Sequence, residues 1–178
     1  MFALLTGLLD EKKTAACIVA LRNGEGLAKA TIGFSFYLLD ALYRNGQETE
    51  FHRRLDFWRA LPNFGFTSTP EGPEPGRSDA HAWGAHPAWH TLASIAGIRP
   101  SAPGFGKVRI APLPGPLDRF EASVVHPRGM VEVDFHRKTP GHPAAHFTVR
   151  LPGGITGTLI YSGVSHELMP GENEISYS

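Results

Sequence analysis

Val131-Glu132-Val133-Asp134-Phe135 alternates apolar and acidic side chains residue by residue. In an extended strand successive side chains point to opposite faces, so this run puts its three apolar residues on one face and its two carboxylates on the other. Comparable short runs, separated by proline and glycine, occur before and after it. They predict strands at 107–111, 120–126, 130–137, 145–151, 156–161 and 174–177. Around six strands at this spacing predict an antiparallel β-sandwich.

Before residue 98 the apolar residues recur at helical spacing instead. Asp10 is a suitable N-cap for a helix that ends at Asn23-Gly24. The residues predicted on the inward face of this helix are Thr14, Cys17, Ile18 and Leu21. Further helices are predicted at 30–43 and 48–61. A last one at 82–98, begun or bent at Pro87, would turn Trp89, Leu92, Ala93 and Ala96 inward. The pattern therefore predicts an α+β chain of two domains, residues 1–98 and 99–178.

Composition excludes several classes of function. Lys plus Arg and Asp plus Glu are equal at 17 each, and the longest basic run is Arg53-Arg54, so a nucleic-acid partner is not expected. The apolar run 1–9 lacks a basic start and leads into Asp10, which predicts neither a signal peptide nor a membrane span and favours a cytoplasmic location. The single cysteine, Cys17, has no intrachain disulfide partner and is predicted to be a small buried hydrophobe.

Residues 64–78 contain Pro70 and two further prolines, so no regular element is expected there and the segment is predicted to be a surface loop. Glu71 lies in this loop after Thr67-Ser68-Thr69. A carboxylate held by such a loop can serve as a general base, whereas the simpler interpretation is a solvated loop acid. Glu74 is a weaker candidate for the same role.

His81 lies between Asp79 and Trp83, which suits hydrogen bonding to a polar ligand, with the indole as an apolar surface for a sugar ring. The alternative for Trp83 is a core position at a helix start. A metal site formed by His81, His86 and His90 is disfavoured, because on a helix His81 would point away from the other two and Pro87 disturbs the register. No cofactor is expected. Gly24-Glu25-Gly26 and the segment 126–129 are interpreted as turns.

Several segments carry a further signal when they are taken in order. They are Phe34–Tyr43, Gly65–Glu71, Arg77–Pro87, Gly97–Pro100, Pro103–Pro112 and His126–Gly129. Together they resemble the C-terminal part of bacterial α-L-rhamnosidases of glycoside hydrolase family 78, over most of the chain. The resemblance implies part of an (α/α) barrel of six helical hairpins followed by a β-sandwich, and hydrolysis of terminal α-L-rhamnosyl residues with inversion.

The same resemblance implies roles for individual residues. Glu71 falls on the catalytic base of the family's Thr-Thr-x-x-Glu loop, and His81 and Trp83 fall on residues at the sugar pocket, with Asp79 beside them. Ala80 replaces a cysteine of the family pattern. The acidic segment that supplies the general acid in the family has no counterpart in this sequence, although inversion requires two carboxyl groups.

Two sets of expectations follow for partners and function. Because only some of the barrel helices are present, an apolar edge is expected to be exposed and to favour self-association or binding of a missing N-terminal half. The fragment would then act on a rhamnosyl-containing carbohydrate. The alternative is a noncatalytic carbohydrate-binding or interaction module, or an inactive remnant.

Overall fold

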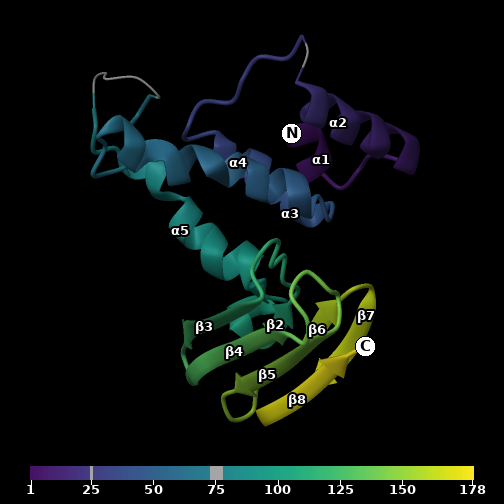
Figure 1. Ribbon diagram of the computed structural model, residues 1–178. Coiled ribbons are helices and arrows are strands. Elements are labelled where there is room, and N and C mark those ends of the chain that lie inside the picture. Colours follow the sequence, from purple (N-terminus) through teal and green to yellow (C-terminus); the bar gives the residue numbers. More distant parts are fainter. Residues whose placement is uncertain (25, 73–77) are drawn as a thin grey trace. The chain divides into compact units, whose positions relative to one another are not determined.

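The computed structural model describes residues 1–24, 26–72 and 78–178 (Figure 1). These residues form two compact units, Met1–His90 and Thr91–Ser178. The first is helical and the second is mostly β, so the predicted α+β class is confirmed. The domain boundary after residue 98 remains a prediction.

The helical unit is built around the contacts of α3 with α1 and with α4. Leu39 and Leu42 of α3 and Phe51 of α4 are fully or almost fully buried between these helices. Its elements are α1 (Phe2–Leu5), α2 (Glu11–Asn23), α3 (Ser35–Arg44), α4 (Glu48–Ala60), single 3₁₀ turns at Leu61–Phe64 and Ala82–Ala85, and α5 (Pro87–His90). The described helices of this chain do not by themselves form the (α/α) barrel that the resemblance implies.

Helix α2 has the predicted ends but not the predicted burial. The Asp10 carboxylate accepts a hydrogen bond from the Lys13 backbone N–H at 2.8 Å, and Gly24 ends the helix at φ +69°. No residue of α2 is buried, and Cys17 is partly exposed, so the predicted burial of Cys17 was wrong. Helical spacing decides which residues share a face, but another element must cover that face before they are buried.

The segment predicted as one helix at 82–98 is broken into several elements. After the 3₁₀ turn and α5, residues Thr91–Ile95 form a π-helical turn closed by the Ala96 N–H donating to the Thr91 carbonyl at 2.9 Å. An i to i+5 bond of this kind adds a residue to the turn and changes which residues face the core. Leu92, 38% exposed, therefore does not point inward as predicted, whereas Ala93 and Ala96 are buried as predicted. Trp89, which lies before this turn in α5, is 44% exposed, so its predicted burial was also wrong.

The β unit contains two four-stranded sheets, β1-β2-β6-β7 and β3-β4-β5-β8 (Figure 1). Pairing is antiparallel except between β2 and β6, which are parallel. The strands are β1 (Ile98–Pro100), β2 (Lys107–Ile110), β3 (Arg119–His126), β4 (Gly129–Arg137), β5 (Ala145–Leu151), β6 (Thr156–Tyr161), β7 (Val164–Leu168) and β8 (Gly171–Tyr177). All six predicted strands are present. β1 and β7 were missed, because β1 is three residues long and β7 is mostly exposed and lacks apolar alternation.

The core of this unit follows the alternation of β4. Val131, Val133 and Phe135 are at most 2% exposed, as the sequence predicts. The rings of Phe147 in β5 and Tyr161 in β6 lie 5.1 Å apart between centroids, and these strands belong to different sheets. Aromatic contacts between the two inner faces thus join the sheets into one core.

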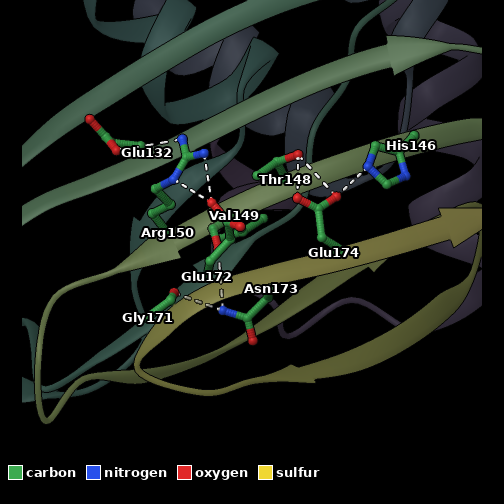
Figure 2. A network of polar contacts seen from close by, with 9 residues as sticks. All are labelled: Glu132, His146, Thr148, Val149, Arg150, Gly171, Glu172, Asn173 and Glu174. Carbon is green, nitrogen blue, oxygen red and sulfur yellow. Dashed lines mark hydrogen bonds and ion pairs between the residues drawn. The ribbon is translucent and has the colours of Figure 1, made fainter.

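The outer face of the sheet β3-β4-β5-β8 carries a network of polar contacts that crosses three strands (Figure 2). Arg150 in β5 donates to Glu172 in β8 at 2.7 Å and lies 3.9 Å from Glu132 in β4. His146 in β5 is bonded to Glu174 in β8. These cross-strand pairs secure β8 at the edge of the sheet, and charged side chains on an edge strand discourage pairing with another chain.

Gly97 joins the helical turn 91–95 to β1 at a point where no side chain fits. Its φ is +73°, and a Cβ there would lie 2.2 Å from the carbonyl carbon and oxygen of Ala111. The Ala111 N–H donates to the Gly97 carbonyl at 3.0 Å. The two backbones are therefore in direct contact, and only glycine permits both this approach and this conformation.

We expect Gly97→Ala to destabilise the protein by about 3 kcal/mol or more, because it adds backbone overlap to left-handed strain. Gly141→Ala is the matched control: Gly141 has φ +71° but a Cβ there would meet nothing within 4 Å, so only the strain of about 1 kcal/mol is expected. Urea unfolding of both variants measures the difference. Equal losses of stability would contradict a role for close backbone approach.

The described part of the helical unit exposes many large apolar side chains. They are Phe2, Leu8, Val19, Leu27, Phe34, Tyr37, Phe64, Trp83 and Trp89. Within the described ranges no helix is long and apolar enough to cross a membrane.

We expect the chain to associate reversibly with itself as its concentration rises, because exposed apolar area favours association. Sedimentation velocity at increasing concentrations measures this; a single monomeric species throughout would contradict it.

Candidate functional site

The two ends of the proline-rich loop are joined by hydrogen bonds, two between backbone groups and one from the Thr69 hydroxyl. The His81 N–H donates to the Thr69 carbonyl at 2.7 Å, and the Thr69 hydroxyl donates to the His81 carbonyl at 3.1 Å. One step further along, the Glu71 N–H donates to the Ser78 carbonyl at 2.9 Å. The backbone that carries Glu71 is thus fixed to the backbone that precedes Trp83, although proline prevents a regular element.

Gly84 lets the segment after Trp83 lie directly against the start of this loop. A Cβ at Gly84 would stand 2.9 Å from Thr69 Cβ and 3.0 Å from the Pro70 carbonyl oxygen. The Trp58 indole N–H donates to the Gly84 carbonyl at 2.7 Å, which holds the segment on α4 as well. The absence of a side chain at residue 84 is therefore required for this arrangement.

The four residues predicted for the site lie on this closed segment. Glu71 and Asp79 are exposed and His81 is partly buried. The His81 ring meets the Trp83 indole edge to face, with centroids 5.5 Å apart and an interplanar angle of 81°. Trp83 is 71% exposed, so the core alternative considered for it from the sequence does not hold. Glu74 lies outside the described residues.

Beside Trp83 lies a groove of about 540 Å³ that the sequence did not reveal. Its largest lining residues are Phe34, Phe36, Tyr37, Trp83 and His86. Gly33 also lines the groove. A Cβ at this position would lie 3.3 Å from Trp83 Cβ and Cε3, so the glycine backbone packs closely against the indole. The predicted helix began at residue 30, whereas α3 begins at Ser35 and residues 32–34 form a turn. The aromatic residues at 34–37 are a signal for this groove in the sequence, but the direction in which their side chains point depends on the residue at which the helix begins.

His86 anchors this turn to the segment that carries Trp83. Its Nε2 lies 3.0 Å from both the Ile32 carbonyl and the Ser35 hydroxyl oxygen. Because a carbonyl only accepts, Nε2 carries the hydrogen and Nδ1 is left as an acceptor. Burial of the imidazole lowers the pKa of His86 below its ordinary value of 6.5, and the bond to Ile32 opposes this shift. The ring is therefore neutral at pH 7.

No group of three or more His, Cys, Asp or Glu side chains that could hold a metal ion occurs within residues 1–24, 26–72 and 78–178. His86 and His90 do meet, with ring centroids 5.7 Å apart. His81 instead contacts Trp83.

The described residues thus form a helical segment with an aromatic groove, followed in the chain by a β-sandwich. Residues 97–176 match the family described as bacterial alpha-L-rhamnosidase C-terminal domain. The resemblance to rhamnosidases predicted from the sequence is thereby confirmed. A comparison with curated proteins gave no match.

Solved structures of rhamnosidases share the fold over most of this chain. The enzyme from Aspergillus terreus overlays 92% of it with a TM-score of 0.78 at 17% identity. The family 78 rhamnosidase of Bacillus sp. GL1 covers 91%, with a TM-score of 0.76 at 22% identity. The Streptomyces avermitilis enzyme, solved with L-rhamnose, covers 82%, with a TM-score of 0.68 at 20% identity. The chain spans about a fifth of the length of these structures, 21%, 18% and 17% respectively.

The lowered pKa of His86 predicts a loss of stability in mild acid. The unfolded state binds a proton at about pH 6.5 and the folded state only at lower pH, so stability is complete above about 6.5 and falls as the pH drops towards the folded pKa. His86→Gln keeps a donor for Ile32 but does not titrate. We expect its urea midpoint to fall less than that of the wild type between pH 7.5 and 5.5.

The control is His136→Gln, which changes an exposed histidine of β4. Its midpoint is expected to follow the wild type over the same pH range. An identical pH dependence of the wild type and His86→Gln would exclude His86 as the source of the effect.

Proposed function

We propose that this chain is part of an α-L-rhamnosidase that hydrolyses terminal α-L-rhamnosyl residues with inversion, with Glu71 as the general base. The observation that supports this most directly is the family match of residues 97–176, combined with a preceding loop at 67–71 that resembles the family's pattern, with Ser68 in place of the second threonine. In the proposal residues 1–98 belong to the catalytic helical domain and 99–178 to the C-terminal sandwich.

Glu71 meets the physical requirements of such a base. Its side chain is exposed, so water can reach the carboxylate, and its backbone is fixed by the bond to Ser78 and by the neighbouring Thr69–His81 pair. In inversion the base activates a water molecule on one face of the sugar while an acid protonates the leaving oxygen on the other, about 6.5–9.5 Å away. The proposal assigns no residue of this chain to the acid, which would come from a rhamnosidase segment outside it.

The neighbouring residues would bind the sugar. Trp83 offers an exposed indole for the apolar side of the ring, and the edge-to-face contact fixes His81 beside it. Asp79 is exposed and directly follows Ser78, whose carbonyl accepts the hydrogen bond from the Glu71 N–H. Its carboxylate would accept hydrogen bonds from sugar hydroxyls. Such contacts orient the glycosidic bond towards the base.

A second candidate function is a noncatalytic carbohydrate-binding module. The observation in its favour is that Trp83 and the groove exist within the helical unit itself. In this case the isolated chain binds L-rhamnose, and Trp83→Ala removes the binding. Calorimetry or NMR titration with millimolar L-rhamnose tests this candidate, and neither heat nor a shift in the spectrum would count against it.

The decisive experiment for the catalytic role compares Glu71→Gln with the wild type in a complete enzyme that contains this chain. Joining the chain to the preceding part of the Bacillus sp. GL1 rhamnosidase provides one such enzyme. We expect Glu71→Gln to lower kcat on an aryl α-L-rhamnoside by about 100-fold to 10,000-fold, because a positioned general base contributes this much.

The matched control is Glu167→Gln, an exposed carboxylate in β7, which is expected to leave kcat unchanged. Asp79→Asn is expected to raise KM more than it lowers kcat, because it removes binding rather than proton transfer. Near-normal turnover of Glu71→Gln would show that another group is the base.

A further inference from the structure

Three side chains on the outer face of the sheet β3-β4-β5-β8 are joined by consecutive hydrogen bonds. His146 in β5 lies directly opposite Ser176 in β8, and Glu174 lies on the same face of β8, two residues before Ser176. The His146 Nδ1 is 3.0 Å from the Ser176 Oγ, and the His146 Nε2 is bonded to the Glu174 carboxylate (Figure 2). A hydroxyl, an imidazole and a carboxylate are thus aligned in the order that nucleophilic catalysis uses.

The carboxylate decides which nitrogen of His146 carries the hydrogen. An ionised carboxylate only accepts hydrogen bonds, so in the neutral ring Nε2 donates to Glu174 and Nδ1 keeps a lone pair. This lone pair accepts the hydrogen bond from the Ser176 hydroxyl. The Thr148 hydroxyl, 3.0 Å and 3.2 Å from the two oxygens of Glu174, donates to the carboxylate and holds it in place. The imidazole is therefore oriented as a general base for Ser176.

In the serine protease triad the hydroxyl is bonded to Nε2 and the carboxylate to Nδ1. In this sheet the two nitrogens are exchanged. Both nitrogens lie in the plane of the ring and have the same acid–base chemistry, so the exchange leaves the roles of the three groups unchanged.

An ester can reach the hydroxyl of this site. Ser176 is exposed, whereas His146 is partly exposed and its ring lies 5.2 Å from that of His136 between centroids. In the sheet as the structure describes it β8 is an edge strand, so its outer row of backbone N–H groups is not used by a neighbouring strand. Such groups can donate to the oxygen of an ester carbonyl as this oxygen gains negative charge.

The surroundings of the site are acidic. On this face carboxylates outnumber guanidinium groups, and the side chains concerned are Glu121, Glu132, Asp134, Glu172 and Glu174 against Arg119 and Arg150. Both arginines are already paired, Arg119 with Glu121 and Arg150 with Glu172. The remaining negative charge attracts cationic molecules and repels anionic ones. The neighbours Thr148 and His136 are polar, so a long apolar acyl chain would gain little by contact with them.

We propose that Ser176, His146 and Glu174 form an esterase site that acts on uncharged or cationic esters of small carboxylic acids. The Ser176 Oγ attacks the carbonyl carbon and passes its proton to His146 Nδ1, which gives it to the alcohol oxygen as the ester bond breaks. Water then attacks the acyl group on Ser176 and passes a proton to Nδ1. The carboxylic acid leaves as Ser176 recovers this proton. Glu174 is a positioning residue, because it acts through His146.

The first test treats the full chain with p-nitrophenyl acetate, a neutral ester with a coloured leaving group. We expect a burst of p-nitrophenolate that corresponds to about one acetyl group per chain, followed by slower release, because hydrolysis of the acyl group follows its transfer. Peptide mass spectrometry is expected to find this acetyl group on Ser176.

Two variants and a control test the roles of the hydroxyl and the imidazole. Ser176→Ala is expected to abolish the burst, and His146→Gln to slow the acetylation of Ser176 by about 100-fold, because a positioned base contributes at least this much. Ser123→Ala is the control and is expected to keep the burst, since Ser123 lies on the same face but opposite Glu132 instead of a histidine. Thermal unfolding of each variant verifies that it is folded.

The role of Glu174 is tested by ¹⁵N NMR, which distinguishes the two neutral forms of an imidazole. We expect His146 of the wild type to carry its hydrogen on Nε2 in mildly alkaline solution. In Glu174→Gln the side-chain amide can either accept or donate, so a mixture of both forms is expected, together with acetylation of Ser176 that is roughly tenfold slower or more. A carboxylate that only held β8 in the sheet would leave the form of the ring unchanged.

The substrate class is tested with two esters of opposite charge, 3-acetoxy-N,N,N-trimethylanilinium and 3-acetoxybenzenesulfonate. The rate of each is divided by its rate with free imidazole, which removes the difference in intrinsic reactivity. At low ionic strength we expect the cationic ester to react roughly tenfold faster on this scale. The difference is expected to shrink at about 1 M salt, because salt screens the charges of an exposed face.

Three results would overturn the proposal. They are the absence of a burst, an acetyl group on other residues but not on Ser176, and unchanged acetylation of Ser176 in a folded His146→Gln variant. Equal scaled rates for the two charged esters would overturn the substrate class. None of these measurements involves a rhamnoside or Glu71, so the proposed catalytic role of Glu71 stands or falls separately.

Discussion

Both units depend on places where two stretches of backbone approach so closely that no side chain fits between them. In the helical unit Gly84 lies against Thr69 and Pro70, and this contact joins the loop of Glu71 to the segment of Trp83. In the β unit Gly97 lies against Ala111, and a Cβ at Gly157 would stand 2.5 Å from the Val108 carbonyl oxygen. At such points packing and backbone hydrogen bonding act together, so that the position of one segment determines that of the other.

In the candidate site the described residues 69–72 and 78–81 hold defined positions without regular secondary structure. The segment from Thr69 to Trp83 is rich in proline and glycine, yet its two ends are held by three hydrogen bonds from Thr69, Glu71 and His81. Loops that are fixed in this way combine exposure of functional side chains with defined positions, which is what acid–base chemistry and ring stacking require. An exposed tryptophan supported by a glycine on one side is consistent with a surface that contacts a ligand.

The β unit combines an apolar interior with a polar outer face. Alternation along β4 separates Val133 and Phe135 from Glu132, and the same separation continues across β5 and β8. Charge pairs such as Arg150 with Glu172 then align the outer face without contributing much stability, since exposed pairs are worth about 0–1 kcal/mol. The core supplies the stability of the sandwich, and the polar pairs favour one register of its edge strand.

The sequence by itself determined the α+β class, the N-cap of α2, six strands and the inward face of β4, because these follow from local spacing and capping chemistry. It also placed Glu71 in an irregular loop and indicated Asp79, His81 and Trp83, which follow that loop, as its partners in the site. Only the tertiary structure decided that Trp83 is exposed, that Cys17 and Leu92 are not buried, and that Phe34 and Tyr37 line a groove with His86. These features depend on which elements cover a face and on a π-helical turn that shifts the register, and neither is encoded in the spacing of nearby residues.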